Sequence, residues 1–435
     1  MIILYRTFFP LLALLLCPYY FHRMWRRGGY GKKIRYRLGF WPSLPAVESG
    51  KKRIWIQAVS VGEVSSISKI LDSLLNHPSI EVVLSGTTST GLVQIEERFG
   101  KQVLAHGPFP LDWWPFSSMA WRRIQANMII TVDSELWPEH FQQASLRGTP
   151  ALVINARLSD RTYRRISNSP LAQNLLLPKG LQIFTTSEKQ RERWVNIGVS
   201  EHFIHIVGNL KIDAAQPRKM NSPTPADLRA EFGFPTEAMV LAGISTWPGE
   251  EELLIQALLE IRNQGIDGRL LLIPRHAERR NQLEAVIKNA QLRYHLRSSG
   301  DQAPEDNWVY LADTTGELPT LILAADLALI GKTLPPNQGG QNPIEPIAIG
   351  LPLVSGPNFQ NFSQTCNDLL LHNAIRGTGS AKEAKNELVT LALSAESRKE
   401  LSQKAKGWIK SQGSPAELTL EKILQILEVP ASENW

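Results

Sequence analysis

The sequence predicts an α/β protein with two domains, each built on a parallel sheet. The chain has 435 residues, of which 43% are hydrophobic, so it is too long for one ordinary domain and apolar enough for two sizeable cores. Short apolar runs alternate with helical stretches, as is typical of parallel strands joined by helices. The alternation stops over residues 214–226, where three prolines occur. We therefore predict a linker at 214–226 between domains at 51–213 and 227–412.

The order of apolar runs gives the expected elements of each domain. In the first domain a helix is expected over 64–76, and strands are expected over 54–59, 80–84, 128–132, 151–154 and 182–186. In the second domain a helix is expected near 250–263, and strands are expected over 239–243, 270–273, 308–310, 327–331 and 353–356.

The C-terminal segment, 413–435, begins with a helix-start signature. Ser414 suits the N-cap, Pro415 suits the first helical position, and Glu417 follows three residues after the cap. Because an amphipathic run follows as far as Leu427, we predict a final helix that packs back across the domain boundary.

The N-terminal segment, 1–22, is predicted to be a membrane anchor. It is nearly all apolar, interrupted only by Arg6, Pro10 and Pro18. Its length is close to the roughly 20 residues of a spanning helix, but the prolines and Arg6 equally permit a helix that lies in the interface. A cleavable signal peptide is disfavoured, because the positive charges follow the apolar stretch and no small-x-small cleavage site occurs.

A basic juxtamembrane segment, 23–50, follows the apolar stretch. Its cationic residues are Arg23, Arg26, Arg27, Lys32, Lys33, Arg35 and Arg37. Such a cluster suits either anionic lipid or nucleic acid, but its place directly after an apolar anchor favours an anionic membrane surface on the cytoplasmic side. We therefore expect no nucleic-acid partner and a cytoplasmic catalytic body.

The net charge and the cysteine and histidine content indicate which kinds of partner and site to expect. The formal net charge of +6 suits an anionic partner. The two cysteines are far apart in the sequence, and the nine histidines are scattered without metal-ligand spacing. We therefore predict neither a disulfide framework nor a metal site.

Three segments of the first domain carry candidate catalytic residues. Glu63 in QAVSVGEV follows a strand and opens a helix, so it suits a general base, although complementing the helix dipole is the commoner role of such an acid. Asp133 and Glu135 in VDSELWPEH follow another strand, where they could orient a substrate or cap the next helix. Lys211 in VGNLKID lies near the linker, where an ammonium could neutralise phosphate charge or simply be solvated.

Three segments of the second domain suit a nucleotide. Pro274 and Arg275 end a strand, where a guanidinium could grip a phosphate. A turn at Thr315, Gly316 and Glu317 precedes a helix, and a glycine-opened helix start contains Asn342, Pro343, Ile344 and Glu345. Such a loop brings backbone donors near phosphate. Because no Walker loop and no Gly-x-Gly-x-x-Gly after a strand occurs, P-loop kinases and nicotinamide enzymes are disfavoured.

Taken in order, the motifs SVGE, SELWP, NARLS, GNLK, STxxGEE, PRHxER, TxGEL and GGxNPIE resemble those of the 3-deoxy-D-manno-octulosonic acid (Kdo) transferases. The resemblance extends to about residue 428. It implies the GT-B fold, with two Rossmann-like doubly wound domains facing across a cleft. It also implies an inverting glycosyltransferase that uses CMP-Kdo, without metal or other cofactor, on a lipid A precursor of the lipid IVA type at the bacterial inner membrane.

The resemblance also implies roles for the candidate residues. Glu63 corresponds to the general base, whereas Asp133 and Lys211 correspond to charge-stabilising groups, with Asp133 standing where the family carries a glutamate. The donor contacts correspond to Pro274, Arg275, Thr315, Gly316, Glu317, Asn342, Pro343, Ile344 and Glu345.

Several positions depart from the family pattern. Gln57 and Gln341 stand where histidines are usual, Trp247 and Pro248 replace a histidine–acid pair, and Lys332 replaces the second glycine of a pair. A transferase of the same fold that uses another nucleotide sugar, and an inactive membrane adaptor, therefore remain as alternatives.

Overall fold

The computed structural model describes residues 1–26, 31–215 and 223–428, except for the side chains of residues 12, 16–26 and 32. The chain forms two compact units, Met1–Ala214 together with the segment from Ser414, and Ala215–Gly413. The side chains of Arg23, Arg26, Arg27 and Lys32, which the sequence assigns to the basic segment, lie outside the described residues. Positions 216–222 of the predicted linker also lie outside them.

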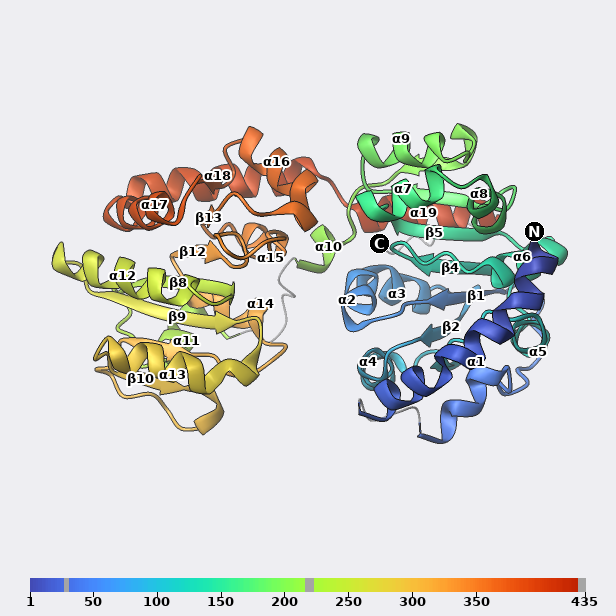
Figure 1. Cartoon of the computed structure of the whole chain (residues 1–435), viewed down its shortest axis with the longest axis horizontal. Helices are drawn as coiled ribbons and strands as arrows, with labels where there is room; N and C mark the ends of the chain where they lie inside the picture. The colour runs from blue at the N-terminus through green and yellow to red at the C-terminus, as the bar shows by residue number, and fades with distance from the viewer. Residues whose placement is uncertain (27–30, 216–222, 429–435) are drawn as a thin grey trace. The chain divides into compact units, whose positions relative to one another are not determined.

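Unit 1 contains a seven-stranded parallel sheet with the order β3-β2-β1-β4-β5-β6-β7 (Figure 1). Its strands are β1 (Lys52–Gln57), β2 (Ile80–Gly86), β3 (Ala105–Pro108), β4 (Met128–Val132), β5 (Ala151–Ala156), β6 (Gln182–Thr185) and β7 (Ile204–Ile206). The direction of winding reverses between β1 and β4. In doubly wound sheets, this switch point is where ligands bind, beyond the carboxyl ends of the strands.

The helices of unit 1 lie before, between and after these strands. They are α1 (Ile2–Arg26), η1 (Gly31–Leu38), α2 (Val61–Ser66), α3 (Ser68–Leu75), α4 (Ser89–Phe99), α5 (Trp114–Ile124), α6 (Pro138–Leu146), α7 (Asp160–Ser167), α8 (Pro170–Leu176), α9 (Glu188–Asn196), η2 (Glu201–Phe203), α10 (Lys211–Ala215) and α19 (Pro415–Leu427).

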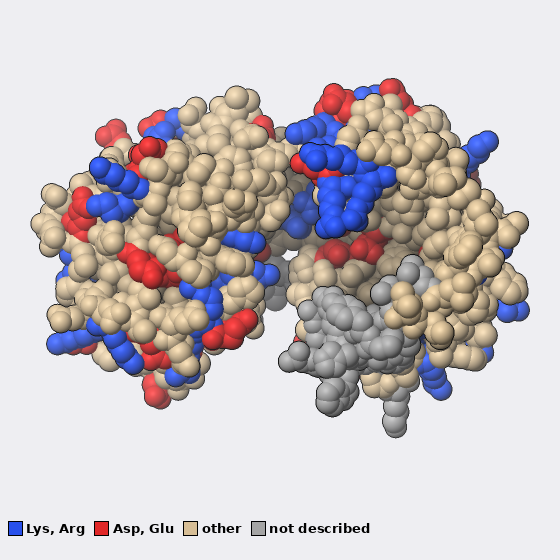
Figure 2. Space-filling model, in the orientation of Figure 1, with Lys and Arg blue, Asp and Glu red and all other residues tan. Residues whose placement is uncertain are grey.

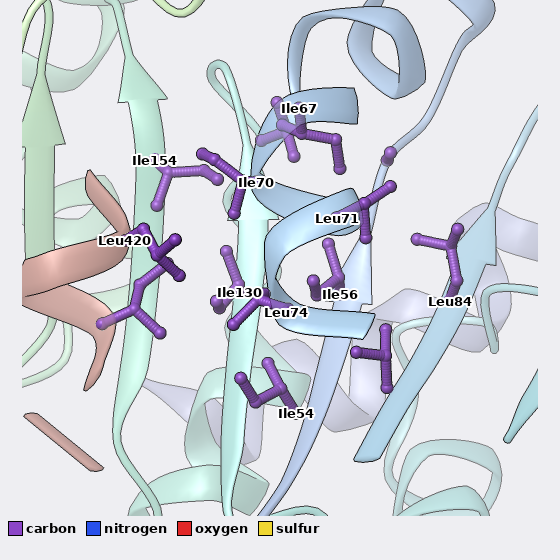
Figure 3. Packing of buried hydrophobic residues seen from close by; sticks show 14 of the residues in the cluster. Ile54, Ile56, Ile67, Ile70, Leu71, Leu74, Leu84, Ile130, Ile154 and Leu420 are labelled. Atoms are coloured by element: carbon purple, nitrogen blue, oxygen red, sulfur yellow. The ribbon is translucent and has the colours of Figure 1, made fainter. Parts of the chain in front are cut away.

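The C-terminal helix α19 completes one face of the core of unit 1. Leu420, Ile423 and Leu424 are buried in the same cluster as residues of α3 and the central strands. Figure 3 shows Leu420 beside Ile154 of β5. The predicted helix is confirmed, and its first turn is held by Asp213, whose carboxylate accepts hydrogen bonds from the Ser414 hydroxyl at 2.9 Å and the Ala416 N–H at 2.8 Å.

The N-terminal helix α1 packs on unit 1 through polar contacts. Arg6 forms a two-pronged ion pair with the fully buried Glu139 at 2.8 and 2.9 Å. The Tyr5 hydroxyl donates to Asp112 at 2.7 Å, and the Trp113 indole donates to the Arg6 carbonyl at 3.0 Å. These contacts fasten α1 across the domain, where Figure 1 shows it lying.

The rest of the described α1 surface is apolar and exposed. The exposed side chains include Ile3, Leu4, Phe8, Leu11, Leu14 and Leu15. No helix within the described residues is long and apolar enough to cross a membrane. In the predicted basic segment, Arg37 does not face outward, because it is buried and donates to the Phe109 carbonyl.

Unit 2 contains a second seven-stranded parallel sheet, with the order β10-β11-β9-β8-β12-β13-β14. Its strands are β8 (Met239–Thr246), β9 (Gly268–Pro274), β10 (Tyr294–Leu296), β11 (Val309–Leu311), β12 (Leu327–Ile330), β13 (Leu353–Ser355) and β14 (Arg376–Gly377). Winding reverses between β8 and β12, so the switch point of this unit lies there.

The helices of unit 2 cover both faces of its sheet. They are α11 (Pro225–Glu231), α12 (Glu250–Asn263), η3 (Ala277–Arg279), α13 (Arg280–Asn289), η4 (Arg297–Ser299), α14 (Leu318–Leu321), η5 (Ile322–Ala324), α15 (Ile344–Ala348), η6 (Gln360–Phe362), α16 (Ser363–Leu371), α17 (Ala381–Leu393) and α18 (Ala395–Ser411). The two parallel α/β domains predicted from the sequence are therefore confirmed.

Two predicted elements differ from the structure. The helix expected over 64–76 starts earlier, at Val61, and is divided into α2 and α3 at Ile67. The helix expected to open at Gly339 and Gly340 starts only at Ile344. Both glycines have positive φ, and a Cβ on Gly340 would lie 2.9 Å from the Phe359 Cα atom. They are therefore needed for a close backbone approach instead of a helix start.

Candidate functional site

Glu63 lies at the switch point of unit 1. It follows β1, and its carboxylate reaches back to accept a hydrogen bond from the Val59 N–H at 2.6 Å and one from the Ser60 hydroxyl at 3.3 Å. Glu63 thus stabilises the first turn of α2, which is one of the two roles considered for it from the sequence. The side chain is only half-buried, so an incoming group can still reach it.

Asp133 follows β4, the strand on the other side of the switch point. Its carboxylate accepts hydrogen bonds from the Asn155 amide and, at 3.1 Å, from the Arg157 guanidinium. It does not cap the next helix, since α6 begins at Pro138 and its first amides bond to Asp112. The capping alternative for Asp133 is therefore wrong.

Asn155 connects two of the predicted catalytic segments. Its side-chain NH₂ donates to Asp133, and its side-chain oxygen accepts from the Leu210 N–H at 3.1 Å. Leu210 directly precedes Lys211, the first residue of α10. Asn155 is fully buried and, like Asp133, has a positive φ, which is uncommon for a residue other than glycine. One amide therefore fixes both the Asp133 turn and the Lys211 loop.

Two acids at this edge, Glu63 and Glu135, have raised pKa values. Burial raises the pKa of Glu63 to about 8, with the Asp133 and Glu135 carboxylates adding to the effect and the Val59 N–H opposing it. Burial also raises the pKa of Glu135 to about 7, again with a contribution from Asp133. Raised carboxyl pKa values close to neutrality are characteristic of groups that exchange protons with a substrate.

One face of unit 1 carries a dense group of basic side chains. Figure 2 shows these Lys and Arg side chains next to Asp and Glu side chains. Helix α7, which follows β5, exposes Arg161, Arg164 and Arg165. This edge of the sheet can therefore present a proton acceptor to an anionic substrate.

In unit 2, Pro274 and Arg275 lie at the carboxyl end of β9, beside the end of β8. Pro274 is buried, Arg275 is exposed, and the Arg275 N–H donates to the Thr246 carbonyl at 3.2 Å. The guanidinium thus projects from a fixed backbone at the edge where parallel sheets bind ligands.

Thr315, Gly316 and Glu317 lie beyond β11 at the same edge of the sheet. Thr315 and Gly316 are exposed, as expected for a turn before a helix. Glu317 is the N-cap residue of α14, and its carboxylate forms an ion pair with Arg297 at 2.8 and 2.6 Å. The Arg297 contact keeps the pKa of Glu317 below its usual range, so this group is anionic at neutral pH.

Asn342, Pro343, Ile344 and Glu345 form the loop and first turn of α15. The Asn342 side-chain oxygen accepts from the Ile344 N–H at 3.3 Å, and Glu345 is half-buried in the first turn. The segment comes after β12, so all three predicted nucleotide segments follow strands whose carboxyl ends share one edge of the sheet.

Glu250 is a structural residue of this edge that we did not assign a role from sequence. It is 1% exposed, and its carboxylate accepts from the N–H groups of Trp247, Lys332, Thr333 and Leu334 at 2.9 to 3.3 Å. Glu250 belongs to the STxxGEE motif. The motif alone does not predict its hydrogen bonds, because Lys332 lies 82 residues further along the chain.

The sequence of this chain matches known proteins of one kind. A family model described as 3-deoxy-D-manno-octulosonic-acid transferase (kdotransferase) matches residues 32–214. The 3-deoxy-D-manno-octulosonic acid transferase of Haemophilus influenzae is 29% identical over 86% of this chain and 86% of its own length. That of Bordetella pertussis is 28% identical over 85% and 86%. The chain is therefore similar to the Kdo transferases along most of its length, and these relatives are glycosyltransferases.

Solved structures of other proteins are similar in fold to this chain. A putative UDP-N-acetylglucosamine 2-epimerase from Listeria monocytogenes has a TM-score of 0.60 at 13% identity, covering 87% of this chain and 97% of its own. A glycosyltransferase from Rickettsia africae has a TM-score of 0.58 at 12% identity, covering 87% and 98%. These likenesses show the fold alone.

Proposed function

We propose that this chain is a Kdo transferase that moves Kdo from CMP-Kdo to a phosphorylated, acylated disaccharide of the lipid IVA type, at the cytoplasmic face of the bacterial inner membrane. The observation that carries the proposal is the position of Glu63. It lies at the switch point of unit 1, near Asp133, with a pKa raised to about 8. A carboxylate of that basicity can accept a proton from a sugar hydroxyl in the transition state.

In the proposed reaction, the Glu63 carboxylate takes the proton of the acceptor hydroxyl as its oxygen bonds to the anomeric carbon of Kdo. The bond between that carbon and the phosphate oxygen breaks, CMP leaves with the electron pair, and the configuration inverts. Lys211 stabilises the charge on the leaving phosphate, and Asp133 stabilises positive charge at the anomeric carbon. The hydrogen bonds of Asn155 support this assignment, because they order both catalytic segments.

The donor is proposed to bind at the edge of unit 2. Arg275 would contact its phosphate, while the turn at 315–317 and the segment 342–345 would contact the rest of the nucleotide. The exposure of Arg275 and Thr315, and the shared edge of their strands, support this placement.

The acceptor is proposed to be reached from a lipid surface on which α1 lies. Among its described side chains, α1 exposes Ile3, Leu4, Phe8, Leu11, Leu14 and Leu15, whereas Arg6 and Tyr5 fasten its other side to unit 1. A helix with those two sides suits an interfacial position better than a spanning one. The exposed arginines of α7 suit the phosphate of the acceptor.

The test is transfer from CMP-Kdo, generated in the assay, to a tetra-acylated lipid A precursor in detergent, followed by mass spectrometry. We expect the wild type to add one or more Kdo masses and Glu63→Gln to add none. Glu97→Gln, which changes an exposed glutamate on α4, is the matched control and should retain activity. A wild type that binds CMP but transfers no Kdo would overturn the proposed substrate.

A further inference from the structure

Trp247 and Lys332 form a contact at the switch point of unit 2. Trp247 follows β8, Lys332 follows β12, and winding reverses between these two strands. The Lys332 ammonium nitrogen lies 4.4 Å from the centroid of the Trp247 ring. This is a cation–π contact, and it lies where a doubly wound sheet binds its ligand.

Both residues are held in place by one buried carboxylate. Glu250 accepts from the Trp247 N–H and from the Lys332 N–H, each at 2.9 Å. His276, which follows β9, packs edge-on against the indole with ring centroids 5.4 Å apart. The ammonium is therefore presented from an ordered platform of three neighbouring strand ends.

The backbone at Lys332 argues against a merely structural lysine. Its φ is +61°, a conformation that costs energy for any residue with a Cβ and that glycine adopts freely. Trp247 and Lys332 are also two of the positions at which this chain departs from the motif pattern of the Kdo transferases. A cation in this conformation at a ligand crevice indicates a function for its charge.

The charge of Lys332 is available to a ligand. Within the described residues, no ion pair joins its ammonium to a carboxylate, and the side chain is only half-buried. The nearby Glu250 carboxylate is already bonded to four N–H groups. Arg275 is exposed at the end of β9, on the other side of β8 from β12, and adds a second cation to the same edge of the sheet.

We infer that Lys332, held on Trp247, binds an anionic group of the sugar-nucleotide donor and thereby determines donor affinity. The inference rests on the proposed function, in which the donor carries two such groups, the phosphate and the carboxylate of Kdo. Both offer the same chemistry to an ammonium, and kinetics with the donor and with CMP can separate them.

The test compares the wild type with Lys332→Met, which keeps the aliphatic stem, and Lys332→Arg, which keeps the charge. We expect Lys332→Met to raise KM for CMP-Kdo about tenfold while kcat changes little, because a hydrogen bond to a charged group in the bound complex is lost. Lys332→Arg should recover most of the affinity. Lys382→Met, an exposed lysine on α17, is the control and should leave KM unchanged.

Inhibition by CMP identifies which anionic group of the donor Lys332 binds. A tenfold weaker inhibition of Lys332→Met by CMP assigns Lys332 to the phosphate, and unchanged inhibition assigns it to the Kdo carboxylate. A KM for CMP-Kdo within twofold of wild type overturns the inference. Should the wild type bind CMP without transferring Kdo, the proposed function fails, and an unchanged CMP affinity in Lys332→Met then overturns the inference as well.

Lys332→Gly separates binding from folding. Because glycine relieves the positive φ, the variant should melt at the wild-type temperature or above. We expect its KM for CMP-Kdo to rise as in Lys332→Met. A lower melting temperature with an unchanged KM would show that the lysine serves the fold instead.

Discussion

Under the proposed function, Glu63 has both of the roles that the sequence presented as alternatives. It accepts hydrogen bonds at the start of α2, and it is also a carboxyl group whose pKa is about 8. Burial and two neighbouring acids outweigh the Val59 N–H, which favours the charged form. At neutral pH most of the free enzyme therefore carries Glu63 protonated, and only the deprotonated fraction can act as a base.

We predict that kcat/KM rises with pH and levels off above about pH 8, because the base must lose its proton. In Glu135→Gln, the midpoint of the rise should move to lower pH, since a neighbouring carboxylate that raises the pKa of Glu63 has been removed. The measurement is the pH profile of initial transfer rates at low donor concentration. A profile that is flat from pH 6 to 9 would contradict the role of Glu63.

Asn155 connects the turn at Asp133 to the loop before Lys211, two of the proposed catalytic residues. Asn155→Gly removes both side-chain hydrogen bonds but tolerates the positive φ, so it isolates the effect of the amide. We predict that kcat falls about a hundredfold, as expected when reacting groups are misplaced by about 1 Å.

The matched control for Asn155 is Gln125→Gly, another positive-φ position, which is exposed at the end of α5. Its kcat should stay at the wild-type value. Steady-state kinetics on both variants, with the donor KM recorded separately, make the comparison. Equal rates in Asn155→Gly and the wild type would contradict the positioning role.

At the scale of elements, α1 is a helix with two different sides. Its inner side carries the Arg6–Glu139 ion pair, and its outer side carries the exposed leucines. The ion pair orients the helix, because removing Arg6 would leave the fully buried Glu139 carboxylate with only the Gln143 amide as a side-chain partner.

We predict that Leu14→Asp combined with Leu15→Asp lowers binding to vesicles that contain anionic phospholipid by at least about a hundredfold. Each leucine contributes about 2 kcal/mol when buried in lipid, and the added charges oppose insertion. Co-flotation with vesicles is the measurement. Leu371→Asp, at an exposed leucine on α16, is the control and should float as the wild type does.

The elements show what sequence patterns can and cannot predict. The interior strand β4 and the helix α12 were predicted with their observed limits, because β4 is an unbroken buried run and α12 repeats its apolar residues with helical spacing. The unpredicted strands β3, β7, β10 and β14 lie at sheet edges, where four residues or fewer pair on one side and need not be apolar. Similarly, Glu63 and Asp133 could be chosen from their motifs, whereas the Asn155 and Glu250 hydrogen bonds depend on neighbouring strands far apart in sequence.

At the scale of the whole molecule, unit 1 is built from two separate segments of the chain. The chain leaves unit 1 after Ala214, forms unit 2, and returns to unit 1 at Ser414. The returning helix buries Leu420, Ile423, Leu424 and Leu427 against the first sheet. Unit 1 therefore depends on residues at both ends of the sequence.

We predict that Leu420→Ala lowers the free energy of unfolding of unit 1 by about 3 kcal/mol, because it leaves a cavity beside Ile154. Leu418→Ala, on the same helix but 47% exposed, should change it by less than about 0.5 kcal/mol. Urea unfolding followed by tryptophan fluorescence gives both values. Similar losses in the two variants would contradict the assignment of α19 to the core.

The return of α19 also sets the timing of assembly on the ribosome. Nascent chains emerge from their N-terminus, and domains generally fold as units in that order. Here the apolar face that α19 covers stays open until α19 has left the exit tunnel, by which time every residue of unit 2 has already been synthesised. Unit 1, whose strands are synthesised before unit 2, is therefore completed only after unit 2 has been made.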